Sequence, residues 1–185
     1  MLDTTVELLR RHGYNGTGFR QVVAESGAPR GSMYHHFPGG KTQLGIEAVT
    51  QAGTFINDIF IAEARKARDF VTAFENVWSW WIGFVEDDGY AGCPIVAVAA
   101  EAHPETPELT AAADAVFARW QATMQVGLER AGLAPEDAKD FALLILAALE
   151  GATVIARASG SRDPLVRVGR RLATMLRAEL GGPPA

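Results

Sequence analysis

Polar side chains that can bind DNA lie close together between residues 30 and 41. Most fall on one short predicted helix, which starts after Pro29 and ends before Pro38 and the two glycines that follow it. Guanidinium, hydroxyl and imidazole groups bind the phosphate oxygens and base edges of a DNA groove. Gly31 lacks a side chain, so the backbone beside it could approach base edges closely. Met33 and Phe37, one turn apart, are predicted to face inward. The sequence therefore predicts a DNA-reading helix at residues 30–36, called the reader helix below.

The side chains of this segment are predicted to play two different roles. Arg30 and Ser32 are expected to read bases in the major groove. Tyr34, His36 and Lys41 are expected to bind phosphates and so to set the register on the duplex. The full set of predicted DNA contacts, which includes residues of the preceding helix, is Thr17, Arg20, Gln21, Arg30, Gly31, Ser32, Tyr34, His35, His36 and Lys41.

A second short helix is predicted immediately before the reader helix. Thr17 can cap it through the side-chain hydroxyl. Phe19, Val22 and Val23 recur at the spacing that buries one face of a helix. Gly27 can supply the positive φ of the corner that follows. Two short helices joined by a glycine turn indicate a helix-turn-helix.

These motifs resemble the TetR/AcrR family of transcriptional regulators. The signature of that family is a helix ending in GY-x-GT, an arginine in the next helix and YHHF at the end of the reader helix. Residues 13–17, Arg20 and residues 34–37 supply these motifs in the same order and spacing. FPGGK at residues 37–41 and GCP at residues 92–94 are similar to one branch of the family. The resemblance implies an all-helical, dimeric repressor that releases operator DNA when a small molecule binds.

The N-terminus departs from the family pattern in one respect. Family members usually carry a basic arm before the first helix, whereas here the apolar stripe of that helix already begins at Leu2. Either the arm is absent, together with its contribution to DNA affinity, or the start of the protein lies upstream.

Charge and composition are compatible with a cytoplasmic DNA-binding protein. The net charge is -5, but residues 1–50 hold five basic and four acidic residues, so the acidity lies in the rest of the chain. Cys93 is the only cysteine, which excludes an intrachain disulfide and fits a reducing compartment. No apolar run approaches the roughly 18 residues that cross a bilayer, so we expect no membrane partner.

The remaining sequence predicts a helical bundle, because long apolar periodic segments alternate with glycine and proline. The fold class expected is all-α, with a three-helix helix-turn-helix DNA-binding domain at residues 1–45. A ligand-binding and dimerisation bundle is expected at residues 46–185. Its predicted helices span residues 42–68, 70–85, 94–102, 107–131, 135–158 and 164–180.

Aromatic side chains concentrate in two helices of the predicted bundle. Tryptophan rings offer flat surfaces that suit planar ligands, and their N–H groups need partners. Aromatic stripes at helical spacing are also typical of an ordinary core, and this alternative stays open. On the ligand interpretation, a small apolar or aromatic inducer binds among Phe74, Trp78, Trp81, Phe84, Phe117, Trp120 and Met124.

The last two predicted helices carry small and apolar residues at one-turn and two-turn spacing, which lets another helix approach closely. The family resemblance implies that this pair packs against its own copy in a homodimer, although the same residues are equally compatible with a core within one chain. The predicted interface residues are Leu143, Ala147, Glu150, Gly151, Val154, Val168, Leu172 and Met175.

Other chemistries are weakly supported. The spacing of His12, His35, His36, His103 and Cys93 matches no zinc template, so neither metal nor cofactor is expected. Cys93 could be a redox sensor at a helix N-terminus, although a lone cysteine is more often a small buried hydrophobe. The sequence contains no nucleophile elbow, phosphate-binding glycine loop or HExxH motif. The competing function is a helical ligand-binding or enzymatic bundle without specific DNA binding.

Overall fold

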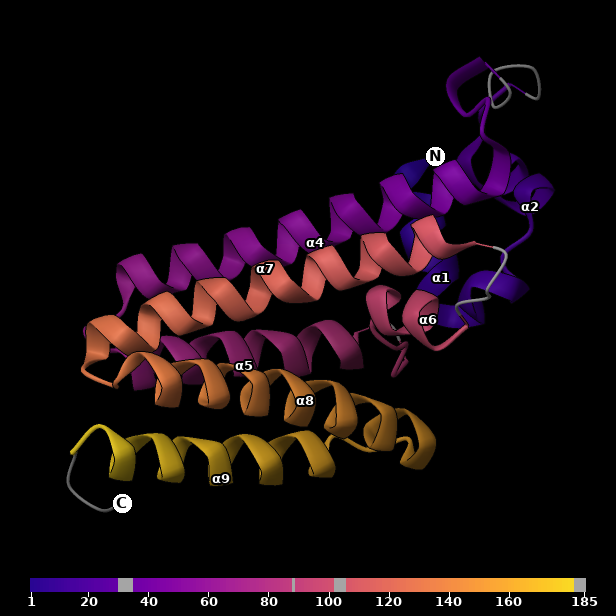
Figure 1. Cartoon of the computed structure of the whole chain (residues 1–185). Coiled ribbons are helices and arrows are strands. Elements are labelled where there is room, and N and C mark those ends of the chain that lie inside the picture. The colour runs from indigo at the N-terminus through magenta and orange to yellow at the C-terminus, as the bar shows by residue number, and fades with distance from the viewer. Residues whose placement is uncertain (30–34, 88, 102–105, 182–185) are drawn as a thin grey trace. The chain divides into compact units, whose positions relative to one another are not determined.

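The structure, a computed structural model, describes residues 1–29, 35–87, 89–101 and 106–181. Regular secondary structure within these ranges is helical, which confirms the all-α prediction (Figure 1). The helices are α1 (Leu2–Gly16), α2 (Phe19–Ser26), α4 (Gly40–Lys66), α5 (Phe70–Glu86), α6 (Pro94–Ala100), α7 (Pro107–Ala131), α8 (Pro135–Ser159) and α9 (Asp163–Glu179).

Helix boundaries follow the local signals in the sequence. Pro94, Pro107 and Pro135 are the first residues of α6, α7 and α8, where a missing N–H costs nothing. Gly27 and Gly160 follow α2 and α8 in the left-handed conformation, with φ of 67° and 59°. The predicted boundaries therefore lie within a few residues of the observed ones.

The chain divides into two compact units. Unit 1 comprises Met1–Phe55 and Gly92–Phe117, and unit 2 comprises Ile56–Ala91 and Ala118–Ala185. The predicted division at residue 45 matches neither boundary. The physical reason is that α6, which the sequence assigned to the second domain, packs against α1 within unit 1.

The core of the helix-turn-helix region lies in unit 1. Leu8, Val22, Phe37 and Leu44 are buried together there, and Phe19 packs at the edge of the cluster. The predicted inward orientation of Val22 and Phe37 is therefore confirmed. Met33 lies outside the described residues.

In unit 2, α9 packs against both α5 and α8, and α8 and α9 lie side by side (Figure 1). Trp78 donates its indole N–H to the Leu165 carbonyl at 2.8 Å, and its ring covers Gly169. Trp81 donates to Oγ1 of Thr153 at 2.9 Å. Both indole N–H groups thus have partners inside the unit, as buried tryptophans require.

Helix α8 is the one described helix that is long and apolar enough to cross a membrane, and 44% of its most apolar stretch is buried within the chain. The core helix of a soluble protein passes the same test of length and composition. The stretch also contains Glu150, a charged residue that is costly inside a bilayer.

Candidate DNA interface, dimer face and ligand cavity

Helix α1, which precedes the predicted helix-turn-helix, contains a kink near its C-terminal end. Gly13 has φ of 74° and ψ of 178°, which interrupts the helix there. The Thr17 hydroxyl donates to the Gly13 carbonyl at 2.7 Å, and the Thr17 side chain is only 3% exposed. Gly18 is the N-cap of α2, and no side chain caps it. The predicted capping role of Thr17 is therefore wrong, and this hydroxyl is not available to a phosphate.

Glu101, which follows α6, sits over this kink. Its Oε2 accepts the Asn15 backbone N–H at 2.5 Å, and its carboxylate occupies the space that a Cβ on Gly13 would need. A side chain at position 13 would therefore collide with Glu101, in addition to the strain of its positive φ.

A second contact joins α1 to the segment before α6. Arg10 and Gly92 bond in both directions: Gly92 N–H donates to the Arg10 carbonyl at 3.2 Å, and Arg10 Nε donates to the Gly92 carbonyl at 3.3 Å. Arg10 is 3% exposed and also pairs with Glu7 at 3.4 Å. Arg10 thereby holds the GCP segment, residues 92–94, against α1.

Lys41 lies beside the same kink. Its Nζ is 4.4 Å from the centre of the Tyr14 ring and donates to the Asn15 carbonyl at 3.4 Å. Partial burial lowers the pKa of Lys41, and the nearby Glu101 carboxylate acts in the opposite direction. A phosphate at this position would add an attractive charge to a partly desolvated ammonium group.

Three other predicted DNA contacts are described and have exposed side chains: Arg20, His35 and His36. The two histidine rings meet edge to face with their centres 5.4 Å apart. Gln21 is half-buried and donates to Glu25 at 2.9 Å. Arg30, Gly31, Ser32 and Tyr34 lie outside the described residues.

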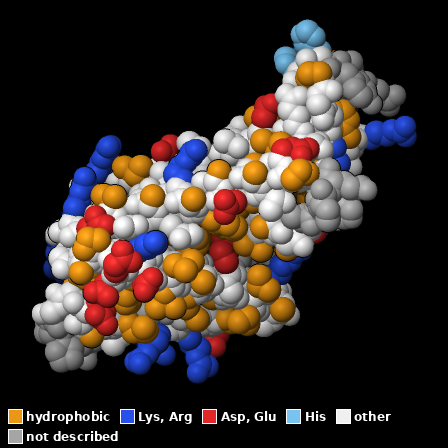
Figure 2. Space-filling view, viewed as in Figure 1, with side chains coloured by type: hydrophobic (Ala, Val, Ile, Leu, Met, Phe, Trp, Pro, Cys, Tyr) orange, Lys and Arg blue, Asp and Glu red, His pale blue; other side chains and the backbone are white. Residues whose placement is uncertain are grey.

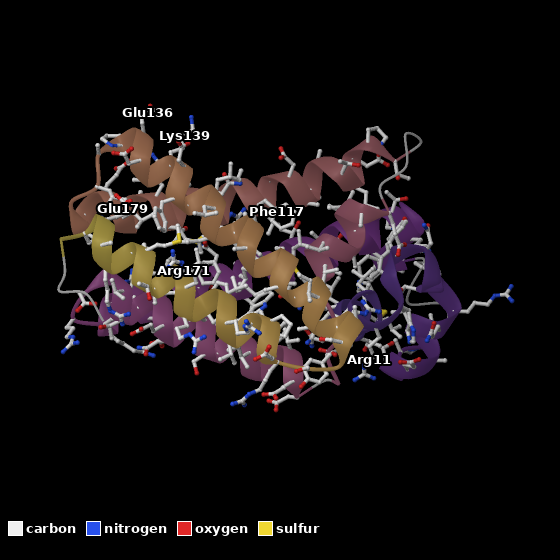
Figure 3. All side chains as sticks on the ribbon, turned by 90° about the horizontal axis from the view of Figure 1, so that it is seen from below. Arg11, Phe117, Glu136, Lys139, Arg171 and Glu179 are labelled. Carbon is white, nitrogen blue, oxygen red and sulfur yellow. The ribbon has the colours of Figure 1, made fainter. Side chains whose placement is uncertain are left out.

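An apolar face of α8 is open to solvent. Leu143, Val154 and Ile155 are 52%, 54% and 57% exposed, and Ala147 and Gly151 lie exposed between them. Hydrophobic side chains gather over this helix in the space-filling view (Figure 2). Seen from below, α8 and α9 form the face turned to the viewer, with charged residues along it (Figure 3). Among the labelled residues, Glu136 and Lys139 lie on α8, and Arg171 and Glu179 lie on α9.

The predicted interface residues divide between this face and the interior. Leu143, Ala147, Gly151 and Val154 are exposed, and Glu150, Val168 and Met175 are half-buried. Leu172 is buried within the chain, so its assignment to the interface is corrected. The intramolecular alternative holds for Leu172, because the stripe of α9 also packs against its own unit.

Unit 2 contains a cavity of about 70 Å³ lined by α4, α5, α7 and α8. Phe74, Trp78 and Met124, three of the residues assigned to the ligand pocket, are among those that line it. A larger surface groove of about 930 Å³ adjoins it, because both share Ala64, Phe70, Ala73 and Gly127 in their walls.

Comparison with known proteins decides the family. Residues 1–48 match the family model described as "Bacterial regulatory proteins, tetR family". Residues 71–171 match "Transcriptional regulator LmrA/YxaF-like, C-terminal domain". The chain belongs to the TetR family. Regulators of this family bind operator DNA as dimers, and its members are transcriptional regulators rather than enzymes. The competing interpretation as an enzymatic bundle is therefore wrong.

Relatives of this TetR-family regulator span almost the whole chain. An uncharacterized HTH-type transcriptional regulator of Mycobacterium tuberculosis is 37% identical over 185 residues, covering 97% of this chain and 94% of the relative. The HTH-type transcriptional regulator LmrA of Bacillus subtilis is 30% identical over 181 residues, covering 96% and 95%.

Solved structures of TetR-type regulators share the fold. One from Chloroflexus aurantiacus has a TM-score of 0.80 at 27% identity and covers 96% of this chain and 92% of that one. A cysteine mutant of the regulator CifR, solved with a 26bp double-strand operator DNA, has a TM-score of 0.75 at 21% identity and covers 93% of each chain.

In this TetR-family chain, several residues assigned to the ligand pocket lie elsewhere. Trp81 and Trp120 are fully buried, with ring centres 6.4 Å apart, and line neither the cavity nor the groove. Phe84 stacks on Trp80 at 5.2 Å, and Phe117 belongs to unit 1. The core interpretation is the better one for the first pair, since their rings pack edge to face in the interior.

The cavity also uses residues that sequence reasoning missed. Phe60, Thr123, Ile145 and Leu149 each line it, from three different helices. Each lies on an ordinary apolar or mixed helical stripe, and no local signal separates a cavity wall from a filled core. Cys93, meanwhile, is buried, which fits the small-hydrophobe alternative better than an accessible redox sensor.

Proposed function

We propose that this regulator is a cytoplasmic repressor that binds a near-palindromic operator as a homodimer and is released by a small apolar or aromatic ligand. The observation that carries the proposal is the exposed apolar face of α8 in a chain of a family that binds operator DNA as dimers. Soluble proteins rarely leave such a surface open unless it meets a partner.

The proposed dimer interface comprises the exposed residues of α8 together with Glu150, Val168 and Met175. Small residues at positions 147 and 151 allow close approach of a second helix. Two-fold symmetry would present two reader helices to successive major grooves, one helical turn apart. A palindromic operator follows from that symmetry.

DNA contact is assigned to residues 1–45, with the reader helix at residues 30–36. Arg30 and Ser32 read bases, whereas Tyr34, His36 and Lys41 bind phosphates. Arg20, Gln21, Gly31 and His35 complete the proposed surface. The exposure of Arg20, His35 and His36 supports the assignment.

Ligand release is supported by continuity along two helices. α4 and α7 line the cavity in unit 2, and each continues into unit 1. A ligand that displaces these two helices in unit 2 therefore displaces helices that are continuous with unit 1, to which DNA binding is assigned. Release requires that the ligand bind one conformation better than the other.

Operator binding tests the proposal directly. Fluorescence anisotropy with DNA flanking the gene, at one stated salt concentration, should show binding at least a thousandfold tighter than to random DNA, on the order expected of specific regulators. Sedimentation of the same sample should show a dimer. Equal affinity for flanking and random DNA would refute the proposal that the protein represses genes next to its own.

A further inference from the structure

One residue that carries a hydroxyl, Thr123, is among the otherwise apolar residues that line the cavity in unit 2. Thr123 of α7 lines the cavity, and the other lining side chains are aliphatic, aromatic or sulfur-containing, apart from one glycine. Among these side chains, the indole of Trp78 is the only one that carries an N–H group. The polarity of the wall therefore depends on where these two hydrogens point.

Both hydrogens are already used. The Thr123 hydroxyl donates to Oδ1 of Asn57 at 2.8 Å, and the Trp78 indole donates to the Leu165 carbonyl at 2.8 Å. A hydroxyl has one hydrogen and two lone pairs, so Thr123 still has an acceptor to offer. Asn57 is buried on α4 and fixes this direction. Among the lining side chains, Thr123 thus carries a hydroxyl acceptor, and neither Thr123 nor Trp78 has a free hydrogen to donate.

We propose that Asn57 and Thr123 make the cavity selective for an apolar ligand that carries a hydrogen-bond donor, such as an aromatic hydroxyl or N–H. This rests on the proposed function, because it assigns a ligand class to the same cavity. A ligand with only acceptors would bury its oxygen against the Thr123 oxygen without a hydrogen between them. A carboxylate would lose its hydration with no cation in the wall to replace it.

Three single-ring probes of similar shape separate these cases: p-cresol carries a donor, 4-methylanisole carries only an acceptor, and p-xylene carries neither. Trp78 lines the cavity, so the tryptophan fluorescence of the full-length protein should report binding, and calorimetry gives an independent affinity. The expected order is that p-cresol binds tighter than 4-methylanisole.

Thr123→Val removes the hydroxyl and nearly keeps the shape. The preference for p-cresol over p-xylene should fall by about threefold to tenfold, the range of one net hydrogen bond. This variant leaves the buried Asn57 amide without its Thr123 partner. The double variant Asn57→Leu/Thr123→Val removes that unpaired amide and should show the same decrease in the preference for p-cresol over p-xylene. Thr174→Val on α9, outside the lining, is the matched control and should leave the preference unchanged.

Asn57→Leu alone provides a signature that a purely structural role would not produce. It releases the Thr123 hydrogen, so 4-methylanisole should gain affinity relative to p-xylene. An unchanged preference in Thr123→Val would overturn the proposal, and so would the absence of binding by all three probes. Operator binding is measured without any ligand, so a failure of the repressor function would be seen separately.

Discussion

At the scale of single residues, Lys41 is the described cation that most directly tests the DNA-binding surface. Lys41→Ala should weaken binding to operator and random DNA by the same factor and lower the salt dependence by about one unit, because one phosphate contact is lost. Lys41→Met is the control for packing, since it keeps an apolar chain over the Tyr14 ring. Anisotropy titrations at several salt concentrations measure both. A loss confined to the operator would move Lys41 from phosphate binding to base reading.

Residue roles could be predicted from the sequence where a local rule decides them. Gly27 adopts the positive φ expected of the corner, and Phe37 faces inward as its spacing predicts. The role of Thr17 could not be predicted in this way. Its hydroxyl can either cap the N-terminus of α2 or donate to the carbonyl of Gly13, and the kink in α1 places that carbonyl within reach. Trp81 was assigned to the ligand pocket for a similar reason, because Thr153, which accepts its indole N–H in the core, is distant in the sequence.

At the scale of elements, α5 depends on a side-chain cap. Asp69 accepts the Thr72 backbone N–H at 2.7 Å and is the N-cap of the helix. Asp69→Ala should lower stability by about 1 kcal/mol, as for other N-caps. Thermal unfolding measures this, and Asp69→Asn should recover most of the loss, because asparagine also caps helices well.

The same cap predicts a pH dependence. The hydrogen bond from Thr72 holds the pKa of Asp69 below its usual value. Its stabilising effect is therefore complete above the unfolded-state pKa of about 3.9 and disappears as the pH falls through the lower folded-state pKa. Wild type and Asp69→Asn should differ less in melting temperature in strong acid than at neutral pH. A constant difference would show that the carboxylate charge is irrelevant.

Element boundaries were predictable because proline and glycine mark them, whereas the grouping of the elements was not. Helix α6 is separated from α1 by most of the chain's first half, and the contacts that join them run through Arg10, Gly92 and Glu101. No periodicity in either helix indicates such a pairing. Cavity walls were hidden for the same reason, because they are assembled from four helices.

At the scale of the whole molecule, Gly151 separates dimer formation from folding. A Cβ at this position would meet nothing within 4 Å inside one chain. Gly151→Leu should therefore keep the fold of the single chain, and improve helix propensity, while blocking close approach of a second copy. Sedimentation should show dissociation to a folded monomer. Gly83→Leu, at another open helical glycine, should remain dimeric. A dimeric Gly151→Leu protein would place the interface elsewhere.

Coupling between ligand and operator is also a property of the whole molecule. A ligand that weakens DNA binding by some factor must itself bind the DNA-bound protein more weakly by the same factor. Using p-cresol as the probe, fluorescence titrations with and without operator should give dissociation constants that differ by that factor. Identical constants would mean that the cavity binds ligand without controlling DNA.

The bond pair between Arg10 and Gly92 bears on how such regulators can be recombined. A fragment cut after the reader helix would lose the backbone partner of a buried arginine and the carboxylate over the α1 kink. Exchange of DNA specificity between two such proteins therefore requires transplanting residues 92–101 along with the N-terminal segment. In this chain the segments that must be transferred together are not contiguous in sequence. A graft of the first 45 residues alone would therefore carry an incomplete core.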